Sequence, residues 1–361
     1  MATQVTDDRV VRLQPDAPPP RRLRPRGYHT SDLIVLGAAA TSSLGLTWLV
    51  ATQLLPFQGL QGFLILWAVS FIGLYYLAVR ELDGTVVARD RAMGALIAIV
   101  SIAVLVPLGL IVIYVTVQGA KYLRTAFFIR DMSLVPPTAP PEQTGGLAAI
   151  IGTIEQVGIA TLISVPLGVL TAVYLNEVRG RLRHPVRIFV DAMSGVPSIV
   201  AGLFLYATLA VRFGFSGFAA ALALSVLMLP TITRTTEVVL RLVPGGLREA
   251  SLALGGPEWK TVWQVVLPTA RSGIITAGIL GVARVVGETA PLIMTAFGNQ
   301  VVNLNPFSGP QGALPLAAFR AFNGTGPDVL RAWVYVFVLL MLVLILFVGA
   351  RAFGRRSLVG R

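Results

Sequence analysis

Long apolar runs alternate with short polar segments along most of the chain. A helix needs roughly 20 apolar residues to cross the hydrocarbon core of a bilayer. Eight runs of about that length occur, at residues 32–55, 60–79, 93–118, 148–175, 193–211, 216–238, 270–297 and 331–350. The pattern therefore predicts an all-α fold, a polytopic membrane helix bundle of eight spans.

Proline lies inside several of these runs, at Pro107, Pro166, Pro197 and Pro230. A proline within a helix removes one backbone hydrogen bond, so neighbouring helices must satisfy the carbonyl that is left over. We expect kinked helices at these positions. Kinks of this kind are typical of transporters, although they also occur in inert bundles.

The composition agrees with a membrane protein, because only 13% of the residues are charged, whereas soluble domains average about a quarter. The chain has no cysteine, which excludes disulfides, thiolate metal sites and cysteine catalysis. Its two histidines, His29 and His184, flank basic residues outside the apolar runs. We therefore expect neither a metal site nor a cofactor.

The net charge of +12 follows from membrane topology. If the N-terminus is cytoplasmic, most of the 29 lysine and arginine residues fall in cytoplasmic segments of the eight-span arrangement, as the positive-inside rule requires. Both termini are then cytoplasmic. Anionic membrane lipid accounts for the excess positive charge, so we expect no nucleic-acid partner.

The segments outside the spans differ in character. Residues 1–30 are basic and rich in proline, which predicts a disordered cytoplasmic arm and not a cleaved signal peptide. The external segments 119–147 and 298–330 are rich in proline, glycine and asparagine and are interpreted as short loops. Residues 351–361 are expected to form a cytoplasmic tail.

A cytoplasmic segment at 247–268 predicts two short helices. The first has an apolar face of Leu247, Ala250, Ser251 and Leu254, ends at Gly255 and Gly256, and gives way to a second helix that Pro257 opens at its first position. The second has Trp259, Val262, Trp263 and Val266 on one face. On periodicity alone, this pair is either a contact surface for a partner or two interfacial helices on the bilayer.

The spacing within this segment favours the partner. Glu249-Ala250-Ser251, three residues, Gly255, nine residues and then Val265-Val266-Leu267-Pro268 resembles the EAA loop of ABC importer permeases, from which Ser251 and Val265 depart conservatively. In that family the loop is a coupling helix seated in a cleft of the ATPase subunit. The resemblance implies ATPase coupling by Glu249, Ala250, Gly255, Trp259, Trp263, Leu267 and Pro268.

The chain contains no Gly-x-x-x-x-Gly-Lys-Ser/Thr motif, so it lacks the loop that cradles nucleotide phosphates. We therefore expect it not to be an enzyme, and ATP hydrolysis to take place in a separate subunit.

From about Gly145 to Gln311 the chain resembles PstA-type permeases of phosphate importers. The stretches that carry the resemblance are 166–169 with 174–177, 195–200, 234–237, the EAA-like loop and 283–292. The resemblance implies a type I importer permease core of six spans within 93–350, so the two spans at 31–80 are additions. It also implies inorganic phosphate as substrate, a PstC-like second permease, a PstB-like ATPase dimer, a PstS-like phosphate-binding protein and a location in the bacterial plasma (inner) membrane.

The sequence offers two charged pairs for a substrate path. Arg284 lies near the middle of the 270–297 run, where a charge is costly and usually faces a bundle interior, and its planar fork matches phosphate oxygens. Glu288 follows one helical turn later and can neutralise it. Arg234 and Glu237 form a second pair near the cytoplasmic exit. Asp191 is interpreted as a helix N-cap.

Alternatives remain for each of these residues. The pair of Arg284 and Glu288 can be purely structural, and Arg234 can extend to lipid headgroups. The substrate can be another oxyanion such as sulfate or molybdate, or the chain can be a membrane scaffold without a transport path. One further hypothesis is that Glu288 accepts a proton from hydrogen phosphate, which sulfate cannot donate.

Overall fold

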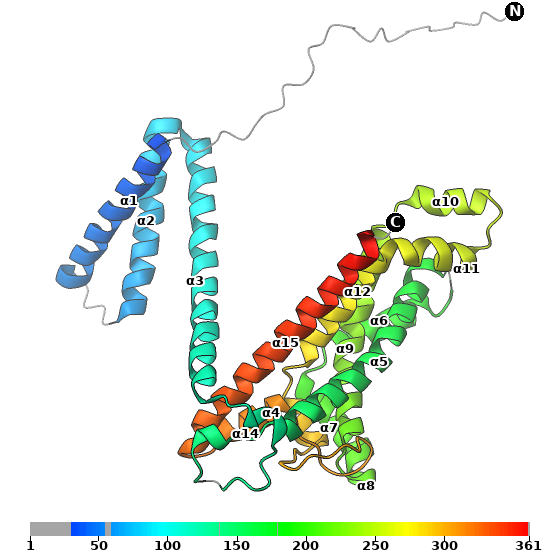
Figure 1. The fold of residues 1–361 in the computed structure, drawn as a ribbon. Helices are drawn as coiled ribbons and strands as arrows, with labels where there is room; N and C mark the ends of the chain where they lie inside the picture. The colour runs from blue at the N-terminus through cyan, green and yellow to red at the C-terminus, as the bar shows by residue number, and fades with distance from the viewer. Residues whose placement is uncertain (1–29, 55–58, 137, 179, 360–361) are drawn as a thin grey trace, which may run out of the picture. The chain divides into compact units, whose positions relative to one another are not determined.

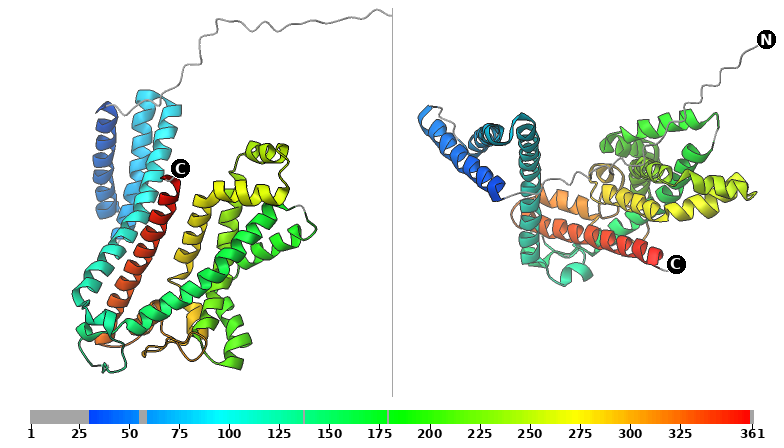
Figure 2. Two further views of the ribbon diagram at one scale, coloured as in Figure 1. Left: turned by 45° about the vertical axis from the view of Figure 1, so that its right-hand side comes forward. Right: turned by 90° about the horizontal axis from the view of Figure 1, so that it is seen from above.

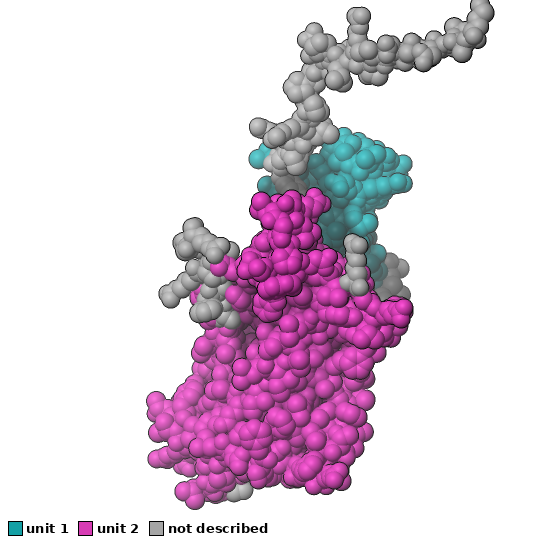
Figure 3. Space-filling view, turned by 90° about the vertical axis from the view of Figure 1, so that its right-hand side faces the viewer, with its two compact units in different colours: residues 1–109 teal, residues 110–361 magenta. Residues whose placement is uncertain are grey.

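The structure, a computed structural model, describes residues 30–54, 59–136, 138–178 and 180–359. Within these ranges every regular element is a helix, and the only β-type pairing is an isolated bridge between Phe297 and Gln311. The all-α prediction is therefore confirmed. The chain divides into two compact units, residues 1–109 and 110–361 (Figure 3). The arm predicted for residues 1–30 lies outside the described residues except for Thr30.

Unit 1 contains α1 (Thr30–Leu49), the π-helix η1 (Val50–Leu54), α2 (Leu60–Asp83) and the first part of α3 (Thr85–Tyr122). Its small core joins α1, α2 and α3 through Ala39, Phe71, Tyr75, Val79 and Ala88.

Charges tie the ends of the same three helices. Arg91 of α3 forms ion pairs with Asp32 of α1, at 2.9 Å, and with Asp83 of α2, at 3.3 Å. The first two spans predicted from the sequence thus exist as helices that pack on each other and on α3.

Unit 2 is a bundle in which α5 (Leu147–Glu177), α9 (Gly217–Arg241), α12 (Leu267–Val285) and α15 (Pro327–Val359) lie side by side (Figure 1, Figure 2). Most of α9 is buried, unlike the other long helices. Helix α9 is therefore the centre of this unit, and α5 and α12 pack against it.

Glycines set the close approach to α9. A Cβ atom at Gly168 of α5 would lie 2.8 Å from Ile232 of α9, and one at Gly281 of α12 would lie 2.7 Å from the same side chain. Lipid is as apolar as leucine, so helices in a bilayer associate mainly through such tight packing. The two glycines thus let the helices on both sides reach the central helix.

The predicted span 193–211 is broken in the structure. Helix α6 (Arg183–Ser194) is followed by Gly195 to Pro197 and then by α7 (Ser198–Leu205), the π-helix η3 (Tyr206–Ala210) and α8 (Val211–Phe213), with a bend of 105°. Pro197 caps α7 instead of lying inside a helix. The described residues hold seven helices long and apolar enough to cross a membrane, or eight when this bent pair counts as one span.

The prediction of a single helix over 270–297 is wrong. Helix α12 ends at Val285, Val286 to Thr289 leave the helix, and a short helix α13 (Ala290–Thr295) follows. Gly287 weakens the helix. Pro291 lies in the first turn of α13, where backbone N–H groups make no hydrogen bond within the helix, so a proline is tolerated there. At its other end α12 continues without interruption from α11 (Glu258–Thr261) and the π-helix η4 (Val262–Val266).

Short helices occupy the end of unit 2 at which α15 begins (Figure 1). They are α4 (Ala126–Ile129), the 3₁₀-helix η2 (Pro141–Gln143) and α14 (Leu314–Phe322). The interpretation of 298–330 as a short loop is wrong, because α14 buries Leu314, Leu316 and Ala318 and packs on α15. Helix α15 continues to Val359, beyond the predicted end at 350.

We predict that Gly202→Ala destabilises the protein. A Cβ at Gly202 of α7 would lie 2.6 Å from the Cα of Pro291 in α13, and backbone moves less readily than a side chain, so we expect a loss of about 1–3 kcal/mol from overpacking. Thermal unfolding in detergent should show a lower midpoint. The matched control is Gly158→Ala in α5, where a Cβ meets nothing within 4 Å. Equal midpoints for the two variants would contradict this packing.

Candidate functional site

Arg284 lies in the last turn of α12 and faces α9. Its Nη1 donates a hydrogen bond to Oγ1 of Thr231, at 3.1 Å, and the side chain is otherwise exposed. At 1.5 Å per residue, Thr231 lies about 21 Å from the start of α9 and about 15 Å from its end. The permanently charged Arg284, at the end of α12, is thus exposed beside the middle of α9. At that depth it needs water or a protein partner.

Glu288 does not neutralise Arg284 as predicted. It lies half-buried in the non-helical break after α12, and among the described residues no ion pair joins it to Arg284. Residues four apart face each other only while the helix continues, and α12 ends at Val285. The predicted pair is therefore wrong, and a role of either residue in substrate passage stays a prediction.

Glu237 of α9 is the centre of a charge cluster. Its side chain is only 3% exposed, and its oxygens pair with Arg187 at 2.5 Å, Arg234 at 2.7 Å and Arg241 at 3.1 Å. The ion pair between Arg234 and Glu237 is present, as the spacing predicts. Arg187 comes from α6, so the cluster fastens that helix to α9.

Asp191 also joins the cluster, by an ion pair with Arg234. The interpretation of Asp191 as a helix N-cap is wrong, since α6 begins at Arg183 and Asp191 lies within it. Thr231 and Arg234 are three residues apart on α9 and so share a face. Polar groups therefore run from Arg284 past Thr231 and Arg234 to Asp191.

The segment at 247–268 folds as the sequence predicts, into α10 (Gly245–Ala253), a turn, and α11 with η4. Gly255 has a φ of +78°, which favours glycine. Pro257 is the N-cap residue, one position before the predicted one. The turn is fixed by a hydrogen bond of 2.8 Å between the Ser251 and Thr261 hydroxyls.

The same segment presents apolar side chains to its surroundings. Trp259 and Trp263 are 63% and 59% exposed, and Leu254 is 90% exposed. Val266, by contrast, is fully buried and belongs to a core cluster with Leu240 of α9. Helices α10 and α11 form the end of unit 2 opposite to α14 (Figure 1). The tip of the segment is thus an uncovered apolar surface on a well-anchored base.

Arg248 connects α10 to two long helices. Its Nη2 and Nε contact the Glu177 carboxylate of α5 at 2.9 and 3.3 Å. The same guanidinium donates to the carbonyls of Leu240 and Val243 at the end of α9, both at 2.9 Å. A movement of α10 must therefore pull on the ends of α5 and α9. No local pattern in the sequence indicates this clamp, because its partners are 71 residues apart.

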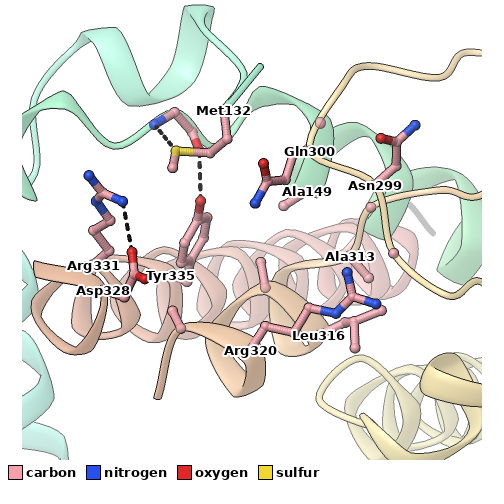
Figure 4. A pocket seen from close by; sticks show the side chains of 16 residues that line it. Met132, Ala149, Asn299, Gln300, Ala313, Leu316, Arg320, Asp328, Arg331 and Tyr335 are labelled. Atoms are coloured by element: carbon pink, nitrogen blue, oxygen red, sulfur yellow. Dashed lines mark hydrogen bonds and ion pairs between the residues drawn. The ribbon is translucent and has the colours of Figure 1, made fainter. Parts of the chain in front are cut away.

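A pocket of about 140 Å³ lies at the other end of unit 2 (Figure 4). Arg331 at its edge is buried and pairs with Asp328 at 2.7 Å, and it also donates to the Ala139 carbonyl at 2.6 Å. The Tyr335 hydroxyl donates to the Gly145 carbonyl at 2.9 Å. These contacts hold the chain around Ala139 and Gly145 on α15, so the charges serve the fold. The described residues contain no group of three or more metal-ligating side chains of the His, Cys, Asp and Glu types.

Asp131 joins the segments at 119–147 and 298–330 to each other. It accepts hydrogen bonds from the Ser133 hydroxyl, at 2.6 Å, and from the backbone N–H of Val302, at 3.3 Å. The bond from Ser133, with help from the backbone donors, lowers the pKa of the Asp131 carboxyl. The carboxylate therefore stays ionised and keeps these contacts at neutral pH.

Residues 164–359 match the family described as binding-protein-dependent transport system inner membrane component. The matched region is more than half of the chain, and it contains the polar face of α9, Arg284 and the segment at 247–268. The chain belongs to this family. It is an inner membrane component of a transport system, and the role of its exposed segment at 247–268 in coupling stays a prediction.

Individual relatives are close. The permease is 44% identical over 209 residues to phosphate transport system permease protein PstA 1 of Mycobacterium tuberculosis (strain CDC 1551 / Oshkosh), covering 56% of this chain and 69% of that one. It is 42% identical over 221 residues to PstA of Xylella fastidiosa (strain Temecula1 / ATCC 700964), covering 60% and 77%. Among solved structures, a chain of the inward-facing MetNI methionine ABC transporter aligns with a TM-score of 0.47 and 23% identity, covering 58% of this permease and 96% of that chain.

We predict that Glu237→Gln weakens the bundle. The amide keeps the size of the side chain but leaves Arg187, Arg234 and Arg241 without their shared anion. These arginines are partly exposed, so water screens them and the expected loss is only about 1–2 kcal/mol. Thermal unfolding measures it, with Glu258→Gln as the control, since Glu258 is exposed and makes no described ion pair. A midpoint unchanged from wild type would contradict the role given to Glu237.

Proposed function

We propose that this permease is a subunit of an ATP-driven phosphate importer and forms half of its translocation path. The observation that carries the proposal is the 44% identity over 209 residues to a phosphate transport system permease protein. All four charged residues that we assign to the path lie in the family-matched region. Sulfate and molybdate, the nearest alternative substrates, have the same oxyanion chemistry. The names of these relatives, however, specify phosphate.

The surroundings of Arg284 support an anion path. A guanidinium cannot lose its charge at physiological pH, and its fork matches two oxygens of a phosphate. The bond to Thr231 occupies one donor of Nη1, which leaves the rest of the fork for an anion. The break in the helix after Val285 is also expected of a path, because unwound backbone at membrane depth is tolerated where it lines a cavity.

Arg234 and Glu237 suit the exit from this path. An anion that leaves Arg284 would next meet Arg234, whose charge Glu237 and Asp191 already balance. The anion must compete with these carboxylates, so we expect it to bind weakly there. Weak binding at an exit favours release over retention.

Glu288 is proposed to accept a hydrogen bond from the P–OH group of hydrogen phosphate. Its position in the break, without an arginine partner among the described residues, leaves the carboxylate available as an acceptor. Sulfate carries no proton at neutral pH, and two anions would repel each other. On this hypothesis Glu288 favours phosphate over sulfate, although a separate binding protein would supply much of the selection.

The coupling loop is proposed to dock in an ATPase subunit through Trp259 and Trp263, with Glu249, Ala250, Gly255, Leu267 and Pro268 shaping the loop. The clamp of Arg248 on Glu177 would then transmit closure of the ATPase to α5 and α9. The partners that the resemblance implies are a PstB-like ATPase dimer, a PstC-like second permease and a PstS-like binding protein. The loop and both termini would be cytoplasmic, in a bacterial inner membrane.

Residues 93–350 are proposed as the permease core, and 31–80 as two additional helices that pack against the partner permease or lipid. The family match begins only at residue 164, so it does not extend to these helices. A scaffold subunit without a transport path is the alternative to the whole proposal. The exposed charge of Arg284 beside the middle of α9 favours transport, because a scaffold does not need a cation there.

We predict that Arg284→Gln lowers phosphate uptake about 10-fold to 100-fold, since a hydrogen bond to a charged group contributes about 1.5–3 kcal/mol. Glu288→Gln should lower uptake and reduce the preference for phosphate over sulfate. The measurements are uptake and phosphate-dependent ATPase stimulation in the reconstituted complex. Arg271→Gln is the control, because Arg271 makes no described ion pair. Uptake at the wild-type rate in the Arg284 variant would refute the assigned path.

We predict that replacing both Trp259 and Trp263 by alanine weakens ATPase binding at least about 30-fold, as expected when two buried aromatic anchors are truncated. Co-purification of the ATPase subunit measures this loss. Trp48→Ala is the matched control, because Trp48 of α1 is also 63% exposed but lies outside the loop. An ATPase that stays bound to the double variant would show that the tryptophans contact lipid instead.

A further inference from the structure

A second charged pocket lies where α5, α6, α9 and α10 meet. It has a volume of about 450 Å³ and is lined by Asn176, Glu177, Arg183, Arg241 and Arg248. It lies at the coupling-loop end of unit 2. Arg241 is ten residues from Thr231 on α9, so the pocket is about 15 Å along the helix from the contact of Arg284.

The pocket has more positive than negative charge. Three arginines line it, and Glu177 is the only acidic group among the lining residues. Both oxygens of Glu177 contact Arg248. Arg183 has no acidic partner among the described ion pairs, and Arg241 shares Glu237 with two other arginines. An additional anion would therefore meet cations that are incompletely neutralised.

Hydrogen-bond donors are also left over. Arg183 uses its Nε for the Leu175 carbonyl, at 2.8 Å, and in the described hydrogen bonds its two Nη groups donate to nothing. Arg241 donates only through Nη2, to Glu237. Each guanidinium thus keeps at least two nitrogens for an outside acceptor. Phosphate groups fit such forks, because they offer several oxygens in the plane of the donors.

We propose that this pocket binds a phosphate group, held by Arg183 and Arg241, in addition to any cargo that passes Arg284. The group belongs either to inorganic phosphate or to the headgroup of an anionic lipid. Both sources reach the ends of spanning helices, and the volume admits a free phosphate with water or a larger headgroup. The inference does not depend on the proposed function, since it concerns other residues and a different place.

Binding here would affect the coupling loop. The anion would join Arg183 at the start of α6 to Arg241 at the end of α9, beside the clamp of Arg248 on Glu177. It would stabilise the arrangement in which these helix ends meet α10. Because a ligand stabilises the state that it binds, phosphate or lipid at this position would resist movement of the loop.

The test uses the full chain in nanodiscs and has two arms. In one arm the discs contain only phosphatidylcholine, and inorganic phosphate is titrated. In the other the discs contain added phosphatidylglycerol and no inorganic phosphate. Thermal stabilisation and retained lipid in native mass spectrometry are the measurements. We expect binding in at least one arm, and the arm identifies the source.

Variants distinguish binding in this pocket from binding elsewhere on the protein. Arg183→Gln with Arg241→Gln should weaken binding at least 10-fold, and Asn176→Asp, which adds a negative charge with little change in size, should do the same. Arg271→Gln should bind like the wild type. In an Arg284→Gln background, which lacks the cargo contact, the Arg183 and Arg241 double variant should still weaken binding. Binding in neither arm, or unchanged binding in the Arg183 and Arg241 double variant and in Asn176→Asp, would overturn the proposal.

Discussion

The close packing of α9 between α5 and α12 is the constraint on which the rest of unit 2 depends. Gly168 and Gly281 bring both neighbours against Ile232, in a setting where lipid offers no hydrophobic drive for association. This packing buries most of α9 and leaves the face of Thr231 and Arg234 less covered. The same packing brings Arg284 of α12 to Thr231. The polar face therefore exists because the opposite faces of the helix are filled.

Two carboxylates then organise the arginines at the end of unit 2 that carries α10. Glu237 gathers Arg187 and two arginines of its own helix, and Glu177 holds Arg248. An ion pair of this kind adds little net stability, but its partners are costly to separate. Each carboxylate joins elements that are distant in the chain, α6 to α9 in one case and α10 to α5 in the other. These ion pairs therefore connect α6 and α10 to the long helices of the bundle.

The arginines at this end serve different tasks. Arg248 donates to Glu177 and to two carbonyls, so it is a structural clamp, and Arg234 is balanced by Glu237 and Asp191. Arg183 and Arg241 have donors to spare. Arg284, in the middle of the bundle, has a hydroxyl as its protein partner. These arginines thus differ in their ability to bind an anion, because the acceptors around them differ.

The sequence by itself determined the features that depend on neighbouring residues. Hydropathy placed the long helices apart from those predicted over 193–211 and 270–297. Gly255 and Pro257 placed the turn in the segment at 247–268, and the three-residue spacing of Arg234 and Glu237 placed their ion pair. Only the tertiary structure decided the packing of α14 and the contacts of Glu177 and Asp191. Local rules hold while a helix continues, whereas these contacts join groups brought together by packing between elements far apart in the chain. No spacing in a single sequence encodes that packing.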